Sequence, residues 1–488
     1  MTVTTPFAQY IEDNQQSLID RLAEAVAIAS VSGDVSYRPE VHRMGAWLAA
    51  ELEKLKVTVR VVPLGKQDMD GTEVDLPPVV FGQYGSDPKK KTILALKSDG
   101  WNTEPFSLTE DKENGRFFGR GSSDDKGPVL GWLNVIEAHQ KTNTELPVNL
   151  KMCFEGMEES GSNGLEELIV KESKTFLADV DAVCISDNYW LGTTSPCLTY
   201  GLRGLAYFKV SVSGPGVDLH SGVFGGTVHG QPCSHPQLSR LTVLTAWLIF
   251  SEPMTDLFAV FSKLVTPQGE ILVPGIADKV APLTAEEKAR YDVIDVTVAD
   301  FESAIGAKVT LSEDKSTVLM GRMRYPSLSI HGIEGAFSGG GAKTVIPAAV
   351  HGKFSIRLVP DLTPDDVNAL VQKYLAEEFA KLGSKNTFKV EMLSGGMPWV
   401  ASIDHWNFRA ATKATEAVYN KTPDFTREGG SIPITLTFAD SLGVNVLLLP
   451  MGRGDDGAHS INEKLDRQNY IEGCKLLGTY LHEVANAN

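Results

Sequence analysis

Acidic side chains and one histidine lie just after predicted β-strands, or in a loop that opens a predicted helix, at four places in this sequence. They are Asp124, the neighbours Glu158 and Glu159, Asp187 and His459. In open α/β sheets, functional groups gather where the strands end at their carboxyl edge. We therefore expect these side chains to meet at one edge of a sheet.

Carboxylate oxygens and an imidazole nitrogen form a ligand set that suits Zn²⁺ or Mn²⁺. The adjacent Glu158 and Glu159 can divide the labour, because one carboxylate can bind metal while its neighbour takes a proton from metal-bound water. A bound metal lowers the pKa of water to about 7, which makes hydroxide available at neutral pH. The pattern points to metal-assisted hydrolysis.

Each of these residues also has a simpler structural interpretation. Asp124 could cap the helix that follows it, and Asp187 could merely end a strand. Glu158 and Glu159 could form a solvated pair, and an isolated histidine such as His459 is more often structural than a ligand. Their joint occurrence after successive strands favours the metal site.

Competing motifs are weaker. Residues 335–344 resemble a phosphate-binding loop, but Ala342 stands where that pattern requires glycine. The sequence contains no GxSxG nucleophile elbow, which weakens the case for a serine hydrolase.

The elements that must position these residues follow from the spacing of apolar side chains. Helical periodicity predicts helices at residues 38–56, 126–141, 363–382, 406–420 and 465–487. Short β-rich runs predict strands at residues 57–62, 92–96, 148–154, 182–186 and 444–449. Residues 207–390 differ, with strand-like runs at 207–212, 327–330, 352–358 and 387–392. This alternation predicts an α/β fold interrupted by a second, α+β unit.

Composition narrows the class of protein. The 488 residues include 62 acidic and 45 basic side chains, for a net charge of −17. This balance argues against a nucleic acid or an anionic membrane as the main partner. The apolar run at residues 241–250 falls short of the ~20 residues that a membrane helix needs. Five scattered cysteines exclude a disulfide scaffold and a thiolate zinc site, and without a visible secretory signal we expect a cytoplasmic protein.

Five longer motifs link the chain to a known family. They are GRGSSDDKGP (119–128), FEGMEESGS (154–162), CISDNYWL (184–191), DLHSG (218–222) and RYPSLSIHGIEGAFSGGGAKT (324–344). Through them the chain resembles, over nearly its whole length, the cytosolic non-specific metallodipeptidases. That family includes carnosinase-like enzymes and the fungal Cys-Gly dipeptidase of glutathione turnover.

The resemblance implies a specific architecture. Residues 1–204 and 394–488 would form a mixed-sheet catalytic domain of the di-zinc exopeptidase type, and residues 205–393 an α+β lid and dimerisation domain. It also implies a dipeptide substrate, a homodimer formed through the lid, and two Zn²⁺ or Mn²⁺ ions per subunit.

The resemblance further implies roles for the residues of the predicted metal site. Asp124 would bridge the two ions. Glu159 and His459 would complete one metal site, and Asp187 would serve the other. Glu158 would be the general base.

Four more residues are implied as substrate-binding groups. His220 would reach into the partner subunit's active site and stabilise the tetrahedral oxyanion, a form of electrostatic catalysis. Thr344, Arg357 and Ser431 would bind the substrate, and the planar guanidinium suits a free carboxylate.

Three departures from the family pattern bear on activity. The family's His-x-Asp segment, which carries the other ligand of the Asp187 metal, is missing before Asp99. Residues 231–251 form an unusual insert in the predicted lid, and Ser394 stands where the family has a histidine. We expect the first departure to compromise one metal site.

These departures leave two alternatives to hydrolysis open. The chain could be a metal-poor pseudoenzyme that acts as a dimeric binding protein, or a relative that forms amides. The missing segment and the insert each lie between stretches of intact family sequence, which also suggests misplaced splice boundaries in a predicted gene.

Overall fold

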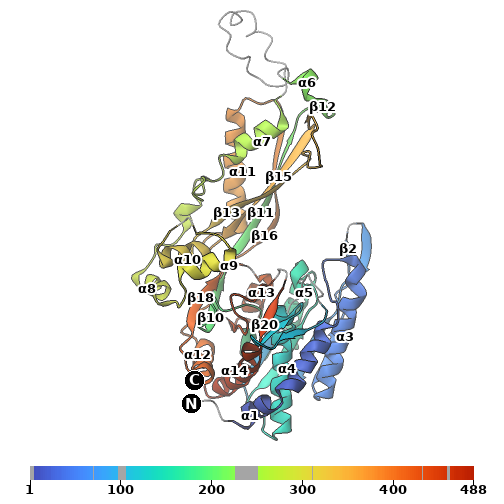
Figure 1. The fold of residues 1–488 in the computed structure, drawn as a ribbon, viewed down its shortest axis with the longest axis vertical. Coiled ribbons are helices and arrows are strands. Elements are labelled where there is room, and N and C mark those ends of the chain that lie inside the picture. The colour runs from blue at the N-terminus through green and yellow to red at the C-terminus, as the bar shows by residue number, and fades with distance from the viewer. Residues whose placement is uncertain are drawn as a thin grey trace, which may run out of the picture.

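The computed structural model describes residues 5–69, 71–96, 106–225, 251–309, 312–430, 432–458 and 462–487. Figure 1 shows two sheet-based parts that follow one another along the long axis of the molecule. The larger sheet, with helices on both faces, makes the lower part, and a four-stranded sheet makes the upper part. Within the described ranges, no helix is long and apolar enough to cross a bilayer.

The larger sheet is mixed, as the α/β prediction requires. Its order is β1-β4-β8-β5-β9-β19-β10-β17, and β18 pairs with β10. The strands are β1 (Thr58–Val62), β4 (Val79–Tyr84), β5 (Thr92–Leu96), β8 (Asn149–Phe154), β9 (Ala182–Ile185), β10 (Cys197–Leu202), β17 (Trp399–Val400), β18 (Asp424–Glu428) and β19 (Asn445–Leu448). Because β8, β5, β9 and β19 are parallel neighbours, their carboxyl ends meet at one edge.

Alternating side chains of these strands face two helical layers. On β5, for example, Ile93 belongs to one apolar core and Leu94 to the other. The first layer contains α1 (Pro6–Asp13), α2 (Gln15–Val26), α3 (Arg38–Lys54), α4 (Gly127–Lys141), α12 (Trp406–Tyr419) and α14 (Arg467–Ala485). The second contains α5 (Leu165–Glu172) and α13 (Pro433–Leu442).

The predicted helices 38–56, 126–141, 363–382 and 406–420 are confirmed within a few residues. The helix predicted from residue 465 begins instead at Arg467, because β20 (Lys464–Asp466) pairs with β7 (Arg116–Phe118). β6 (Thr109–Asp111) completes this small sheet. Apolar periodicity did not predict α1 and α2.

The upper sheet is antiparallel, in the order β13-β15-β11-β16. Its strands are β11 (Gly204–Ser213), β13 (Ser327–Glu334), β15 (Ala349–Leu358) and β16 (Thr387–Gly396). Helices α7 (Pro253–Phe261) and α11 (Pro364–Lys381) cover one face, where every second residue of β11 is buried. All four predicted strands of the middle region are therefore confirmed.

One antiparallel ribbon joins the two sheets. Only Arg203 separates β10 of the larger sheet from β11 of the upper sheet. On the returning chain, Leu202 pairs with Trp399 and Leu205 pairs with Gly396, so the register is the same on both sides of the crossing. The chain therefore passes between the sheets as paired strands.

A separate group of three helices packs beside the larger sheet. It comprises α8 (Ala285–Val293), α9 (Val298–Ile305) and α10 (Lys315–Met323), with Leu191 packed against its core. Between α8 and α9, Asp295 accepts hydrogen bonds from Ser195 and Lys421, both at 2.7 Å. Helices from the predicted lid thus contact the predicted catalytic part, and the division at residues 204 and 394 remains a prediction.

A buried histidine pair joins α4 to α14. The Nε2 atoms of His139 and His482 lie 3.0 Å apart, and His139 Nδ1 lies 2.8 Å from the Val135 carbonyl oxygen. Phe7 of α1 stacks on both rings, with centroids 4.7 Å and 5.4 Å away. Burial lowers the pKa of His139 to about 4 and also lowers the pKa of His482. At neutral pH both rings are therefore uncharged in the folded protein.

We expect the metal-free protein to lose stability as the pH falls from about 6.5 toward 4. A histidine in the unfolded chain has a pKa of about 6.5, so below that pH the unfolded state binds more protons than the folded state. The lowered pKa of His139 corresponds to at most about 3 kcal/mol of unfolding free energy. Urea unfolding at pH 7 and pH 5 measures the part of this loss that falls above pH 5, about 2 kcal/mol.

The variant His139→Gln isolates the contribution of this ring. Glutamine stays polar but does not titrate, so the unfolding free energy of the variant should change less between the two pH values than that of the wild type. Equal changes in the two proteins would contradict the assignment.

Candidate metal centre

Asp124 lies in a short turn, η2 (Ser122–Lys126), that leads into α4. Its side chain is buried, with 5% of the residue exposed. Lys126 occupies the N-cap position of α4, and its side chain makes no capping hydrogen bond. The interpretation of Asp124 as a helix cap is therefore wrong, and the burial of its carboxylate has another cause.

The loops after β9 and β19 come together beside this turn. Tyr189, which follows Asp187, forms a β-bridge with Gly452. A Cβ atom at Gly452 would lie 2.6 Å from Ser123 Oγ and 2.7 Å from a Tyr189 ring carbon, so a larger residue does not fit. The segments that carry Asp124 and Asp187 therefore converge on the loop that follows β19.

Carboxylates lie around the phenol of Tyr189, which is partly buried. Its hydroxyl is hydrogen-bonded to Asp124, and Asp187 and Glu463 lie close enough to act on it electrostatically. Burial, and then these negative charges, raise the pKa of Tyr189 well above its usual value. Burial also raises the pKa of Glu463 to about 7. Buried carboxylates suit a divalent cation, because a bound cation favours their ionised form.

The donor set fits Zn²⁺ or Mn²⁺, since both accept carboxylate oxygen. Asp124, Glu159 and Asp187 do not, within the described residues, bring three ligand oxygens within 4.8 Å of one another. They therefore do not form a cage for a single cation. The predicted scheme, in which Asp124 is shared by two cations, needs no such cage.

Glu158 and Glu159 lie in η3 (Glu158–Ser160), a single helical turn beyond β8. Both residues are partly buried. A hydrogen bond between two hydroxyl groups fixes this turn to the segment before α3: Ser160 Oγ lies 2.9 Å from Ser32 Oγ. β8 and β9 flank β5 in the sheet, so η3 and Asp187 lie at the same sheet edge.

Several predicted features lie outside the described residues. They are His459, Ser431, the junction at residues 97–105 where the His-x-Asp segment is missing, and most of the insert at 231–251. Ser394 is described, and it lies exposed on β16 opposite Tyr207.

His220 and Thr344 lie together at the far end of the upper sheet. β12 (Leu219–His220) pairs with β14 (Val345–Ile346), and the Ser221 N–H donates to the Thr344 carbonyl oxygen at 3.1 Å. Both residues are exposed. Figure 1 places β12 and α6 (Ser221–Phe224) at the opposite end of the molecule from the larger sheet. Within one chain, the structure does not bring His220 to Asp124.

The local geometry of His220 selects one ring tautomer. Its Nδ1 accepts a hydrogen bond from the Gly222 N–H at 3.0 Å. In the neutral ring the proton therefore sits on Nε2. The exposed nitrogen is then a hydrogen-bond donor, as an oxyanion-stabilising role requires.

Arg357 on β15 belongs to a cluster of guanidinium groups at the crossing between the sheets. Arg203 donates to the Gly429 carbonyl oxygen at 3.1 Å and to Ser327 Oγ at 3.0 Å. Burial, helped by the charge of Arg357, lowers the pKa of Arg203 to about 10, and burial lowers the pKa of Arg357. Arg322 pairs with Glu428 at 3.1 Å. Sequence reasoning missed Arg203 and Arg322, although Arg203 lies next to the predicted boundary at residue 204.

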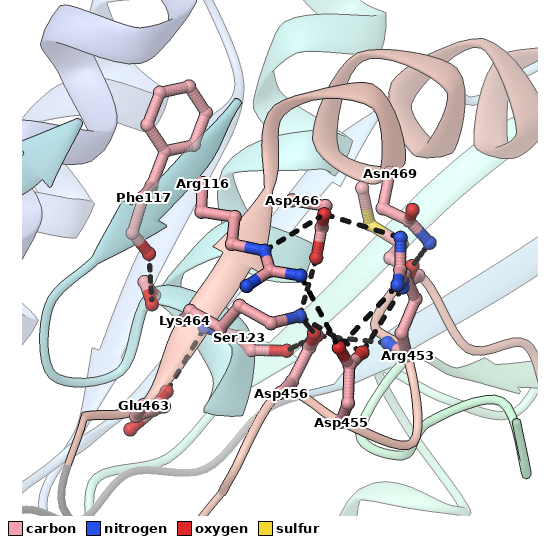
Figure 2. Close-up of polar contacts among 12 residues, drawn as sticks. Arg116, Phe117, Ser123, Arg453, Asp455, Asp456, Glu463, Lys464, Asp466 and Asn469 are labelled. Carbon is pink, nitrogen blue, oxygen red and sulfur yellow. Dashed lines mark hydrogen bonds and ion pairs between the residues drawn. The ribbon is translucent and has the colours of Figure 1, made fainter. Parts of the chain in front are cut away.

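A second carboxylate cluster was not predicted. Asp455, Asp456 and Asp466 have ligand oxygens within 4.8 Å of one another. Figure 2 shows Lys464 in their midst, with Arg453 and Arg116 alongside. Three cationic side chains already balance these three carboxylates, so the cluster does not call for a metal ion.

The chain was compared with known proteins. Residues 95–483 match the model of peptidase family M20/M25/M40. The chain is 52% identical to the Cys-Gly metallodipeptidase dug1 of Schizosaccharomyces pombe, over 98% of each chain. Among solved structures, it resembles the dipeptidase Dug1p of Saccharomyces cerevisiae, with a TM-score of 0.87, 48% identity and coverage of 100% and 99%. It also resembles human carnosine dipeptidase 1, with a TM-score of 0.86, 42% identity and 98% coverage of both chains.

These similarities extend over both sheets and match the implied family. They lend no support to an impaired site or to a non-catalytic binding protein, since the similar chains are themselves dipeptidases. The chain therefore belongs to peptidase family M20/M25/M40, and it is a metal-dependent hydrolase of peptide bonds.

Proposed function

We propose that this chain hydrolyses dipeptides that carry a free carboxyl end, with Cys-Gly as the first candidate substrate. The observation that carries the proposal is the placement of the buried Asp124 turn beside the loops that follow β9 and β19, where Tyr189 forms a β-bridge with Gly452. Similarity to a Cys-Gly metallodipeptidase over 98% of the chain supports the choice of substrate.

Four residues would hold two divalent cations, Zn²⁺ or Mn²⁺. Asp124 would be shared, Glu159 and His459 would complete one site, and Asp187 would serve the other. A cation bound there would lower the pKa of water toward about 7 and polarise the scissile carbonyl group. The carboxylates that act on Tyr189, of which Asp124 is buried and Asp187 partly buried, support this assignment.

Glu158 would carry the proton. Its carboxylate would accept a proton from the attacking water and return it to the leaving amine, so one residue serves as base and then as acid. Its place beside Glu159 in η3, at the carboxyl edge of β8, supports this role.

Arg357 would bind the free carboxylate of the dipeptide, and Ser431 would assist it. A guanidinium group can bind both carboxylate oxygens in one plane. The neighbouring positive charge of Arg203 also attracts an anion to this place. A free carboxyl end is therefore the expected requirement for a substrate.

His220 and Thr344 would serve the active site of a second copy of the chain. Their exposed position, far from Asp124 within one chain, supports a homodimer formed through residues 205–393. The proton on His220 Nε2 would then face the oxyanion formed in the partner's site.

The proposed compartment is the cytoplasm. The free thiols of Cys153, Cys184, Cys197 and Cys474 are all buried. Reduced cysteines are usual in cytosolic proteins, which supports this placement.

Hydrolysis of Cys-Gly by the purified, Mn²⁺-loaded protein tests the proposal. We expect free cysteine and glycine as products. Amidation of the glycine carboxyl should lower kcat/KM by about 10- to 100-fold, because a hydrogen bond to a charged group contributes ~1.5–3 kcal/mol. The variant Arg357→Met should no longer distinguish the two substrates.

The control is Arg60→Met. Arg60 lies on β1, the strand at the opposite side of the larger sheet, where its guanidinium group pairs with Glu172 of α5. This variant should keep the wild-type preference. No release of amino acids from any unblocked dipeptide would overturn the proposed function. A preference that survives in Arg357→Met would overturn the role of Arg357 alone.

A further inference from the structure

Two buried carboxylates outside the predicted ligand set hold the turn that carries Asp124. Asp456 Oδ2 accepts a hydrogen bond from the Ser123 hydroxyl at 2.6 Å (Figure 2). Glu463 Oε1 accepts hydrogen bonds from the backbone N–H groups of Ser123, at 3.0 Å, and of Asp124, at 2.9 Å. Ser123 is thus held through both its side chain and its backbone.

The Glu463 carboxylate accepts hydrogen bonds from several donors of this turn. Its Oε2 accepts from the Gly121 N–H at 3.2 Å, and the Arg120 guanidinium lies 3.5 Å away. A buried carboxylate is costly unless hydrogen bonds satisfy it. Glu463 is only 2% exposed, so its carboxylate depends on these donors in place of water. The same hydrogen bonds fix the peptide groups that precede the Asp124 side chain.

Asp456 is held in turn by Lys464. Its Oδ1 lies 2.6 Å from Lys464 Nζ, and its carbonyl oxygen accepts from the Lys464 N–H at 2.9 Å. Asp456 Oδ2 also accepts from the Arg453 N–H at 2.9 Å. These bonds join Asp456 to Lys464 and Arg453, so the carboxylate that accepts from Ser123 is itself fixed.

The cluster of three carboxylates, from Asp455, Asp456 and Asp466, has a structural role. Lys464 Nζ donates to all three side chains, and Arg453 donates to Asp455 and Asp466. A cation placed among them would meet the Lys464 ammonium group. Asp456 is therefore held to Lys464 and Ser123 and is not a metal ligand.

We propose that Asp456 and Glu463 are positioning residues for the metal centre. They hold the turn that carries Asp124, and so set the placement of one proposed ligand. This inference rests on the proposed metal site. Residues that orient metal ligands typically change metal affinity by about 10- to 100-fold when they are replaced.

The test measures the dissociation constant for Mn²⁺ by competition with a chelator, in full-length protein. Asp456→Asn replaces one acceptor with an NH₂ group that faces either Lys464 or the Ser123 hydroxyl. Glu463→Gln likewise turns an NH₂ group toward backbone N–H donors. Each variant should bind Mn²⁺ about 10- to 100-fold more weakly, with a lower kcat and an unchanged KM for Cys-Gly.

Two further variants separate positioning from loss of folding. Asp455→Asn removes a neighbouring carboxylate that pairs with the same Lys464 and Arg453. Because the Ser123 hydroxyl is held by Asp456, this variant should keep wild-type Mn²⁺ affinity. Ser123→Ala removes only the hydroxyl that donates to Asp456. It should weaken Mn²⁺ binding, and it should add little to the effect of Asp456→Asn in the double variant.

Each outcome decides one question. Wild-type Mn²⁺ affinity in Glu463→Gln and in Ser123→Ala would overturn the positioning role. Equal weakening in Asp455→Asn would also overturn it, because the effect would then be one of general charge. Absence of Mn²⁺ binding by the wild-type protein would instead overturn the proposed function.

Discussion

The variant Glu158→Gln should hydrolyse Cys-Gly about 10²- to 10⁴-fold more slowly than the wild type, the range expected for loss of a general base. Glutamine keeps the size of the side chain but cannot take up the proton of the attacking water. The change should appear in kcat, with little change in KM. Steady-state kinetics with Cys-Gly at saturating Mn²⁺ measures it.

The decisive companion measurement is metal binding. Glu158→Gln should keep wild-type Mn²⁺ affinity, because Glu159 is the proposed ligand of the pair. The matched control is Glu155→Gln, a carboxylate just after β8 that accepts a hydrogen bond from Ser162 at 2.9 Å. It should stay within a few-fold of wild-type activity. Retained turnover in Glu158→Gln would rule out its role as the base.

The variant His220→Ala should lower kcat by about 10²- to 10³-fold, which is typical for loss of one oxyanion donor. This residue is exposed and far from Asp124 in its own chain, so a monomeric mechanism predicts no effect at all. Kinetics with Cys-Gly distinguishes the two expectations.

Mixing two inactive variants tests where His220 acts. A heterodimer of His220→Ala and Glu158→Gln contains one complete site, formed by Glu158 of one chain and His220 of the other. After random subunit exchange, we expect about a quarter of wild-type activity, since half of the dimers would each have one of two sites intact. If the mixture stays as inactive as its parents, the shared active site is refuted.

Local sequence patterns predicted much of the fold. The strands around β5, β8, β9 and β19 were recognisable because buried parallel strands are short apolar runs. Their order in the sheet then brings Asp187 and Glu158 to one edge. The helix α14 shows the limit of periodicity: its predicted first turn pairs with Phe117 as a strand, through a contact between distant parts of the chain.

The surroundings of the predicted ligands could not be read from local pattern. Glu463 lies between an asparagine and a lysine in the sequence, which is typical of an exposed loop, yet it is buried against Ser123 and Asp124. Arg203 had no local signal of burial either. Both depend on long-range contacts, which single-sequence patterns do not encode. The family resemblance supplied roles for His220 and Arg357 that spacing alone does not.

The paired strands that join the two sheets form a stiff connection between them. With a flexible linker, Arg357 would take many positions relative to the proposed metal site. Substrate binding would then have to offset the conformational entropy lost when Arg357 is fixed in one position. Here β15, which carries Arg357, pairs directly with β11 where β11 leaves the ribbon, so the proposed anchor for the substrate carboxylate would be preorganised. A bend at the crossing would displace atoms in proportion to their distance from it. Arg357, which pairs with Leu205 next to the crossing, would then move little, whereas β12, which carries His220 at the far end of the upper sheet, would move the most.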